Sequence, residues 1–124
     1  MSERSFDQRY GGINIKYYYG NAYIGLTPDT NYGLAQTGSE QDGGEVVTRE
    51  VNEDTWVDLN SEGDIVGIEL ADAYKRDVPT PQFTLETLRE RISPRLVVNP
   101  DFVQPLQQKL EFIEAELEWH FSNQ

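Results

Sequence analysis

The stretch that decides the fold runs from Val57 to Ala73 and reads VDLNSEGDIVGIELADA. Its middle part, Asn60 to Asp64, is rich in Asn, Ser, Gly and Asp, which are residues that stabilise turns. The flanking residues, 55–59 and 65–70, are largely apolar or alternate apolar and polar character, which is typical of strands. The stretch therefore predicts a β-hairpin with a short polar connection.

The same residues also fit a second interpretation, the twelve-position calcium loop. Its oxygen-bearing side chains fall at the ligand positions, with a glycine at the turn and a glutamate at the end. These candidate ligands are Asp58, Asn60, Glu62, Asp64 and Glu69, and the glycine is Gly63. A calcium loop needs a helix on each side, whereas residues 45–57 are rich in Val and Thr, which favour a strand. The hairpin is the favoured interpretation, and calcium binding is the lesser alternative.

Further strands are predicted on the N-terminal side of the hairpin. Ile, Tyr and Leu dominate residues 13–26, and Gly20-Asn21 interrupts this segment at its centre, which predicts two strands joined by a tight turn. Val46 to Glu50 adds a strand before the hairpin. Because short antiparallel strands usually pair with their sequence neighbours, we expect a five-stranded antiparallel β-meander with one buried face. The expected core positions include Val57, Leu59, Ile68 and Leu70.

A long segment from Thr27 to Gly44 separates these strands and is rich in Gly, Asp and Asn. Such residues predict a surface loop. Loops longer than about 12 to 15 residues are uncommon unless they are functional or disordered. The segment is therefore either a candidate binding loop or a simple insertion.

The C-terminal part has the pattern of two helices. Thr84 is the expected N-cap of a first helix that ends at Ser93-Pro94, and a second helix begins near Asn99-Pro100 or at Gln104-Pro105 and runs to about Phe121. We therefore predict an α+β domain spanning 1–124, with the β-meander at 13–73 and the helical part at 84–121.

The second helix carries an apolar stripe with alternating steps of three and four residues. Its members are Val103, Leu106, Leu110, Ile113, Leu117 and His120. This spacing is typical of a helix that packs on a sheet or on a partner helix. Because Phe112 and Trp119 widen the stripe beyond what one flank of a small sheet needs, we predict a homo-oligomer that pairs through the residues from Val103 to Leu117.

Composition excludes several classes of function. The net charge of -12 repels nucleic-acid phosphates, and no apolar run is long enough for a signal peptide or a membrane span. The absence of cysteine excludes disulfides and thiol chemistry. We expect a cytoplasmic protein that binds neither nucleic acid nor membrane. Residues 44–78 hold ten acids against three bases, which indicates a solvated surface, adaptation to salt or attraction of a basic partner.

Recognisable catalytic parts are missing from the sequence. His120 is the single histidine and falls at a helix end, and no Gly-rich phosphate loop or nucleophile elbow is present. Asp58 and Glu69 could face each other across the hairpin as paired carboxylates, but chance proximity is expected in so acidic a chain. We therefore predict no enzyme activity, no catalytic residues and no cofactor.

The run Tyr17-Tyr18-Tyr19, with Tyr23 nearby, has two interpretations. In a strand Tyr17 and Tyr19 share one face, so together with Tyr23 they could stack on a nucleotide-like ligand. Arg9 or Arg49 would then contact its phosphate. The alternative is ordinary aromatic packing on a twisted sheet.

About half of the chain resembles the small prokaryotic family catalogued as domain of unknown function 2283. The resemblance is carried by Ile13 to Tyr17, Ala22 to Leu26, Glu50-Val51 and Val57 to Ala73, with Gly67-Ile68-Glu69 and Asp72-Ala73 as its most specific residues. The pattern is a strand, a Tyr-Ile-x-Leu strand, an acidic turn and Gly-Ile-Glu-aliphatic-x-Asp-Ala. Some members look like partners of small RNase-like toxins, so the resemblance implies an antitoxin-like interaction role.

The leading hypothesis is a homo-oligomeric interaction protein that offers an acidic surface to a basic protein partner, as an antitoxin or a phage-type inhibitor does. The alternatives are a small nucleotide-like ligand and calcium. The candidate binding residues are Tyr17, Tyr19, Tyr23, Asp58, Glu62, Asp64 and Glu69.

Overall fold

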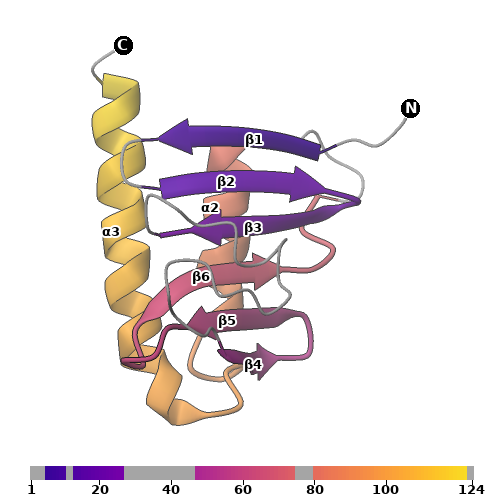
Figure 1. Cartoon of the computed structure of the whole chain (residues 1–124), viewed down its shortest axis with the longest axis vertical. Coiled ribbons are helices and arrows are strands. Elements are labelled where there is room, and N and C mark those ends of the chain that lie inside the picture. The colour runs from indigo at the N-terminus through magenta and orange to yellow at the C-terminus, as the bar shows by residue number, and fades with distance from the viewer. Residues whose placement is uncertain (1–4, 11–12, 27–46, 75–79, 123–124) are drawn as a thin grey trace.

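The computed structural model describes residues 5–10, 13–26, 47–74 and 80–122, and of residues 5–10 it describes the backbone alone. These residues form a six-stranded antiparallel sheet followed by helices (Figure 1). The strands are β1 (Ser5–Tyr10), β2 (Ile13–Tyr18), β3 (Asn21–Gly25), β4 (Val47–Asn52), β5 (Thr55–Leu59) and β6 (Ile65–Leu70). The predicted α+β class, an antiparallel sheet followed by C-terminal helices, is confirmed. The loop predicted from Thr27 to Gly44 lies outside the described residues.

The strand order is β1-β2-β3-β6-β5-β4. Two runs of sequence neighbours, β1-β2-β3 and β4-β5-β6, pair as a meander does, and β3 joins β6 between them. All five predicted strands are present, and β1 extends the sheet by a sixth. The order departs from a single meander because β6, buried at all positions except Glu69, suits the centre, whereas β4 is exposed from Val47 to Glu50 and suits an edge.

One face of the sheet forms the hydrophobic core together with the helices. Strands β2, β3, β5 and β6 contribute the fully buried Ile13, Ile15, Tyr17, Ala22, Ile24, Val57, Ile68 and Leu70. Leu88 from one helix and Leu106, Ile113 and Leu117 from the other close this core. The predicted core positions Val57, Ile68 and Leu70 are confirmed, and Leu59 packs against the core while partly buried.

The turn between β2 and β3 lies one residue earlier than predicted. Tyr19 and Gly20 are its two central residues, with φ angles of 52° and 86°, and Asn21 already belongs to β3. Positive φ at both central positions is the type I′ geometry, whose twist matches that of the flanking strands. Tyr19 occupies a position that usually favours Gly or Asn, and its side chain is 81% exposed.

The helical part comprises α2 (Pro81–Arg91), the 3-10 turn η2 (Pro100–Phe102) and α3 (Val103–Ser122). Thr80, not the predicted Thr84, is the N-cap of α2, because Pro81 suits the first helical position and the Thr80 side chain accepts a hydrogen bond from the Phe83 N–H. Asn99 caps η2 in the same way, at the first of the two predicted starts. Within the described part of the chain, neither α2 nor α3 has the length and apolarity to cross a membrane.

The apolar stripe of α3 faces the protein's own sheet. Leu106, Ile113 and Leu117 are buried in the core, and Val103 and Leu110 pack against it while partly buried. These are the residues that the sequence assigned to an oligomer interface. Their burial is accounted for within a single chain, because a sheet with one apolar face needs a helical cover. Phe112 and Trp119, which widened the stripe, remain 39% and 63% exposed.

Two neighbouring residues of α3 test this placement. Ile113→Ala should lower the free energy of unfolding by about 2 to 5 kcal/mol, because it leaves a cavity in the core. Phe112→Ala, on the outer side, should cost less than about 1 kcal/mol. Urea denaturation of both variants measures the two values. A larger loss for Phe112→Ala than for Ile113→Ala would contradict the inward orientation of the stripe.

Candidate functional site

The face of the sheet opposite the core, termed the polar face, carries Asn14, Lys16, Tyr18, Tyr23, Trp56, Asp58 and Glu69. The strand register places these residues in rows: Lys16 lies beside Tyr23, Tyr23 beside Glu69, and Glu69 beside Trp56. A parallel row holds Gly25, Gly67 and Asp58. The side chains of paired residues project to the same face of the sheet. Because Gly25 and Gly67 have no side chain, the second row leaves open space above β3 and β6.

The Tyr23 side chain occupies the space above Gly67. Its hydroxyl donates a hydrogen bond of 2.8 Å to Asp58 Oδ2. A Cβ atom at Gly67 would lie 1.8 Å from the Tyr23 hydroxyl oxygen, so only glycine permits this crossing of β6. The Thr48 hydroxyl donates to the other oxygen, Asp58 Oδ1, at 2.6 Å. Asp58 is thereby bound from β3 and β4 at once, with 6% of its surface exposed.

The carboxylate of Glu69 is engaged in a similar way. The Tyr18 hydroxyl donates to Glu69 Oε2 at 2.9 Å. Burial of the phenol, followed by the negative charge of Glu69 and the hydrogen bond to it, raises the pKa of Tyr18 well above its ordinary value of 10.0. The two acids considered as a catalytic pair are therefore both bound to tyrosine hydroxyls and help to hold neighbouring strands together.

The arrangement required by a calcium loop is not formed. Its flanks are the strands β5 and β6, so Asp58 and Glu69 project from the sheet while Glu62 and Asp64 lie exposed in the turn. Asn60 Oδ1 accepts hydrogen bonds from the backbone N–H groups of Glu62 and Asp64, which fixes the turn without a metal. Among the residues that the structure describes, no three acidic or histidine side chains converge as metal ligands. The helices that the calcium interpretation requires on each side of this segment are replaced by the strands β5 and β6.

The predicted tyrosine platform is also not formed. Tyr17 is paired with Ala22 and projects into the core, where its ring meets Tyr74 edge to face. Tyr23, the next residue after Ala22, projects to the polar face instead, and both rings are 1% exposed. Tyr19 lies in the turn. The three rings are separated because the strand ends at Tyr18, one residue before the alternation could place Tyr19 beside Tyr17.

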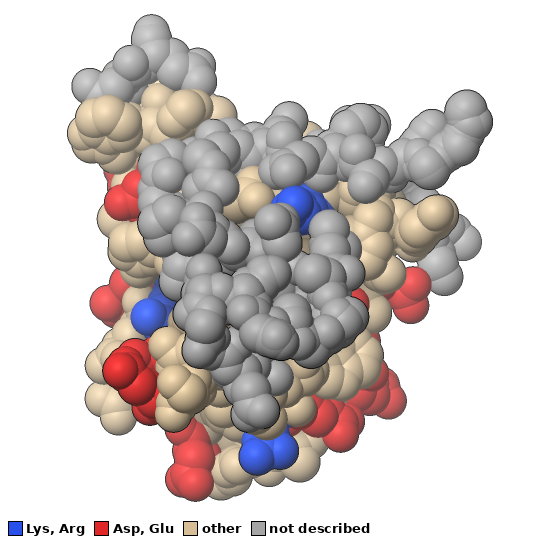
Figure 2. Space-filling model, viewed as in Figure 1, with Lys and Arg blue, Asp and Glu red and all other residues tan. Residues whose placement is uncertain are grey.

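A groove of about 520 Å³ lies between the β4–β5 turn, the C-terminal end of α2 and the chain at 96–98. It is termed the acidic groove, and its lining residues are Glu50, Asn52, Glu53, Asp54, Glu90, Arg91, Leu96 and Val98. Four of these side chains are carboxylates, and Glu50, Glu53 and Glu90 are exposed. Leu96 and Val98, which are 54% and 68% exposed, provide apolar surface. Acidic side chains predominate over basic ones on the lower part of the molecule, where β4 and β5 lie (Figure 2).

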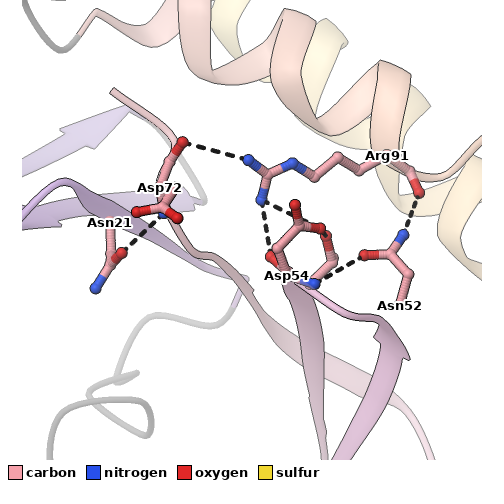
Figure 3. Close-up of polar contacts among 6 residues, drawn as sticks. Asn21, Asn52, Asp54, Asp72 and Arg91 are labelled. Carbon is pink, nitrogen blue, oxygen red and sulfur yellow. Dashed lines mark hydrogen bonds and ion pairs between the residues drawn. The ribbon is translucent and has the colours of Figure 1, made fainter. Parts of the chain in front are cut away.

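Arg91, the single base lining the acidic groove, is directed into the fold (Figure 3). Its Nη1 donates to the Asp54 carbonyl at 2.7 Å and lies 3.7 Å from Asp54 Oδ1, and its Nη2 donates to the Asp72 carbonyl at 3.4 Å. The Arg91 side chain is 15% exposed. The Arg91 carbonyl in turn accepts from Asn52 Nδ2 at 2.8 Å. Arg91 thus fastens α2 to the β4–β5 turn and to the end of β6, and it leaves the groove acidic toward solvent.

The sequence indicated an acidic middle third of the chain, but it singled out neither the groove nor the acids that line it. Glu50, Glu53 and Asp54 belong to the acidic third of the chain, whereas Glu90, Leu96 and Val98 come from the helical part. No local pattern connects segments so far apart, and the Arg91 contacts are formed only once α2 packs on the sheet. Of the predicted site residues, Tyr23, Asp58 and Glu69 lie together on the polar face, and none lines the groove.

Comparison of the chain with protein-family models, with curated proteins and with solved structures gave no match. The resemblance described from the sequence therefore stays a prediction. The polar face and the acidic groove are interpreted from their geometry.

The contact between Tyr23 and Gly67 can be tested by a double-mutant cycle. Gly67→Ala should lower the free energy of unfolding by about 1 to 3 kcal/mol, because the added methyl group displaces the tyrosine. In a Tyr23→Ala background the same change should cost clearly less, since the ring is gone. Chemical denaturation of the four proteins gives the coupling energy. Additive effects would contradict the crossing of β6 by Tyr23.

The raised pKa of Tyr18 predicts a loss of stability in alkali. Folding favours the protonated phenol, so this contribution is complete below the ordinary pKa of 10.0 and declines as the pH rises through the raised pKa. Tyr18→Phe removes the titrating group. The stability difference between wild type and variant should therefore shrink from about pH 8 to about pH 11. Urea unfolding at both pH values measures this stability difference. A difference that is the same at both pH values would contradict the raised pKa of Tyr18.

Proposed function

We propose that the protein is a non-enzymatic interaction module that binds a basic segment of a partner protein in the acidic groove. The observation that carries the proposal is the groove's charge: it presents the carboxylates of three exposed glutamates, Glu50, Glu53 and Glu90, to solvent. Its guanidinium is instead bonded inward to the backbone carbonyls of Asp54 and Asp72. A cytoplasmic partner of the kind that antitoxins or phage-type inhibitors bind agrees with this chemistry.

The electrostatics of the groove favour a cationic ligand. Glu50, Glu53 and Glu90 are exposed, so they retain their hydration and attract lysine and arginine side chains over a distance set by the ionic strength. The net charge of the whole chain, -12, acts in the same direction. Such fields accelerate association and exclude acidic partners more than they strengthen the final complex. Binding should therefore weaken as salt is added.

The apolar surface of the groove narrows the ligand further. Leu96 and Val98 stand 54% and 68% exposed among the carboxylates. Protein interfaces commonly combine an apolar centre with a charged rim. A polycation without apolar residues would leave Leu96 and Val98 uncovered. The ligand that fits best is a segment in which lysine or arginine residues are interspersed with aliphatic ones.

The other candidate functions have less support. The nucleotide-like ligand depended on Tyr17, Tyr19 and Tyr23, which lie apart, and two of them are buried. The proposal also needs no second copy of the chain, since the stripe on α3 is buried against its own sheet. Asp58 and Glu69, the acids that a catalytic role would use, are bonded to tyrosine hydroxyls.

Charge reversal with a matched control tests the proposal. The probe is a fluorescent synthetic peptide of about eight residues that alternates lysine and valine, and anisotropy measures its binding. Glu50→Lys with Glu53→Lys should weaken binding by about tenfold or more. Glu111→Lys with Glu118→Lys changes the net charge equally on the exposed side of α3 and should have little effect. Equal losses in both variants, or no binding by wild type, would overturn the proposal.

A further inference from the structure

Strand β4 is an edge of the sheet, and its outer side continues into the acidic groove. The strand order ends at β4, which pairs with β5 on one side. On the other side, within the described part of the chain, a single backbone bond is found: the Val98 N–H donates to the Val51 carbonyl at 2.8 Å. Residues Val47 to Glu50 are all exposed. Among the described residues, one residue, Val98, thus contacts one end of this edge.

The contact at Val51 shows what the edge can accept. The Val98 N–H is directed at the Val51 carbonyl, which is one hydrogen bond of the kind that a neighbouring strand would make. Val98 and Glu50 both line the groove, so the position of Val98 and the part of the edge that no described residue pairs with border the same space. An extended chain that follows the line begun at Val98 would run along β4 toward Val47.

Apolar side chains gather along this edge. Val47, Leu96 and Val98 are 40%, 54% and 68% exposed, and the other large exposed apolar side chains of the described residues lie in the β2–β3 turn and on α3. Proteins usually protect exposed edges, because unpaired N–H and C=O groups invite other chains. Here exposed apolar side chains lie at both ends of the segment from Val47 to Glu50. This arrangement is expected for a sheet edge that receives a ligand.

The charges determine which chain can bind there. A second copy would bring another net charge of -12 and the same glutamates against Glu50 and Glu53. A basic segment instead places its cations over these carboxylates. Since alternate residues of a strand project to opposite sides, every second side chain of the segment can face the groove while its backbone pairs with β4.

We propose that the partner's basic segment binds by strand addition: it pairs in an extended conformation with β4 along Val47 to Glu50, and alternate side chains enter the acidic groove. This inference rests on the proposed function and specifies its mode of recognition. Backbone hydrogen bonds to β4 supply affinity that is independent of sequence, and the groove selects basic and aliphatic side chains.

N-methylation of the lysine–valine peptide tests this mode. Only every second residue of an added strand directs its N–H toward the neighbouring strand. Two versions of the probe are compared, one methylated at its lysine amides and one at its valine amides, so that bulk and composition are matched. One version should bind about tenfold or more weakly than the unmodified peptide, and the other should bind nearly as well.

The outcomes separate the two proposals. A strong difference between the methylated versions supports strand addition. Equal affinities of the two versions overturn it, and if Glu50→Lys with Glu53→Lys still weakens the unmodified peptide, binding in the groove stands without strand pairing. Failure of the unmodified peptide to bind wild type overturns both. Slowed hydrogen exchange at β4 amides on adding the unmodified peptide, with α3 amides as reference, gives an independent readout of pairing.

Discussion

The pairing of β3 with β6 joins the two halves of the sheet, and every other layer depends on it. On the core side it places Ala22 beside Leu70 and Ile24 beside Ile68, all fully buried. These residues form the continuous apolar floor on which α2 and α3 pack. On the polar side it places Tyr23 beside Glu69 and Gly25 beside Gly67. A shift of this register by one residue would exchange the two faces, exposing the isoleucines and burying the acid.

The same pairing explains how the protein uses its acids in two different ways. Asp58 and Glu69 lie on central strands, where each carboxylate accepts hydrogen bonds from neighbouring side chains and is removed from competition for ligands. Glu50, Glu53 and Glu90 lie at the edge and at the helix end, where they remain hydrated. The bound acids Asp58 and Glu69 therefore contribute to the specificity of strand pairing, and the exposed glutamates give the groove its negative charge.

The hairpin of β5 and β6 could be predicted because its signals are local: Asn60 and Gly63 mark the turn, and apolar residues flank it. The structural role of Gly67 could not be predicted, since it depends on the Tyr23 side chain, which comes from a strand distant in the sequence. Strand β1 carries a weak signal because its SFDQRY sequence is mostly polar, as suits an edge. The Gly11-Gly12 pair before β2 is the cue that would have indicated a further hairpin. The acidic groove depends on the packing of Arg91 against the β4–β5 turn. No spacing of residues in the sequence predicts this contact.

The β4 edge of the sheet is protected from self-association by charge. An open edge in a chain of low charge invites self-association, because the unpaired backbone groups of one copy suit those of another. Here the carboxylates beside β4 oppose the approach of any acidic chain, including a second copy, while no described residue pairs with the outer side of Val47 to Glu50. Charge therefore performs on β4 the protective role that a covering element performs elsewhere. In the proposed mode of binding, a cationic segment removes this protection, since it neutralises the glutamates as it reaches the edge of the sheet.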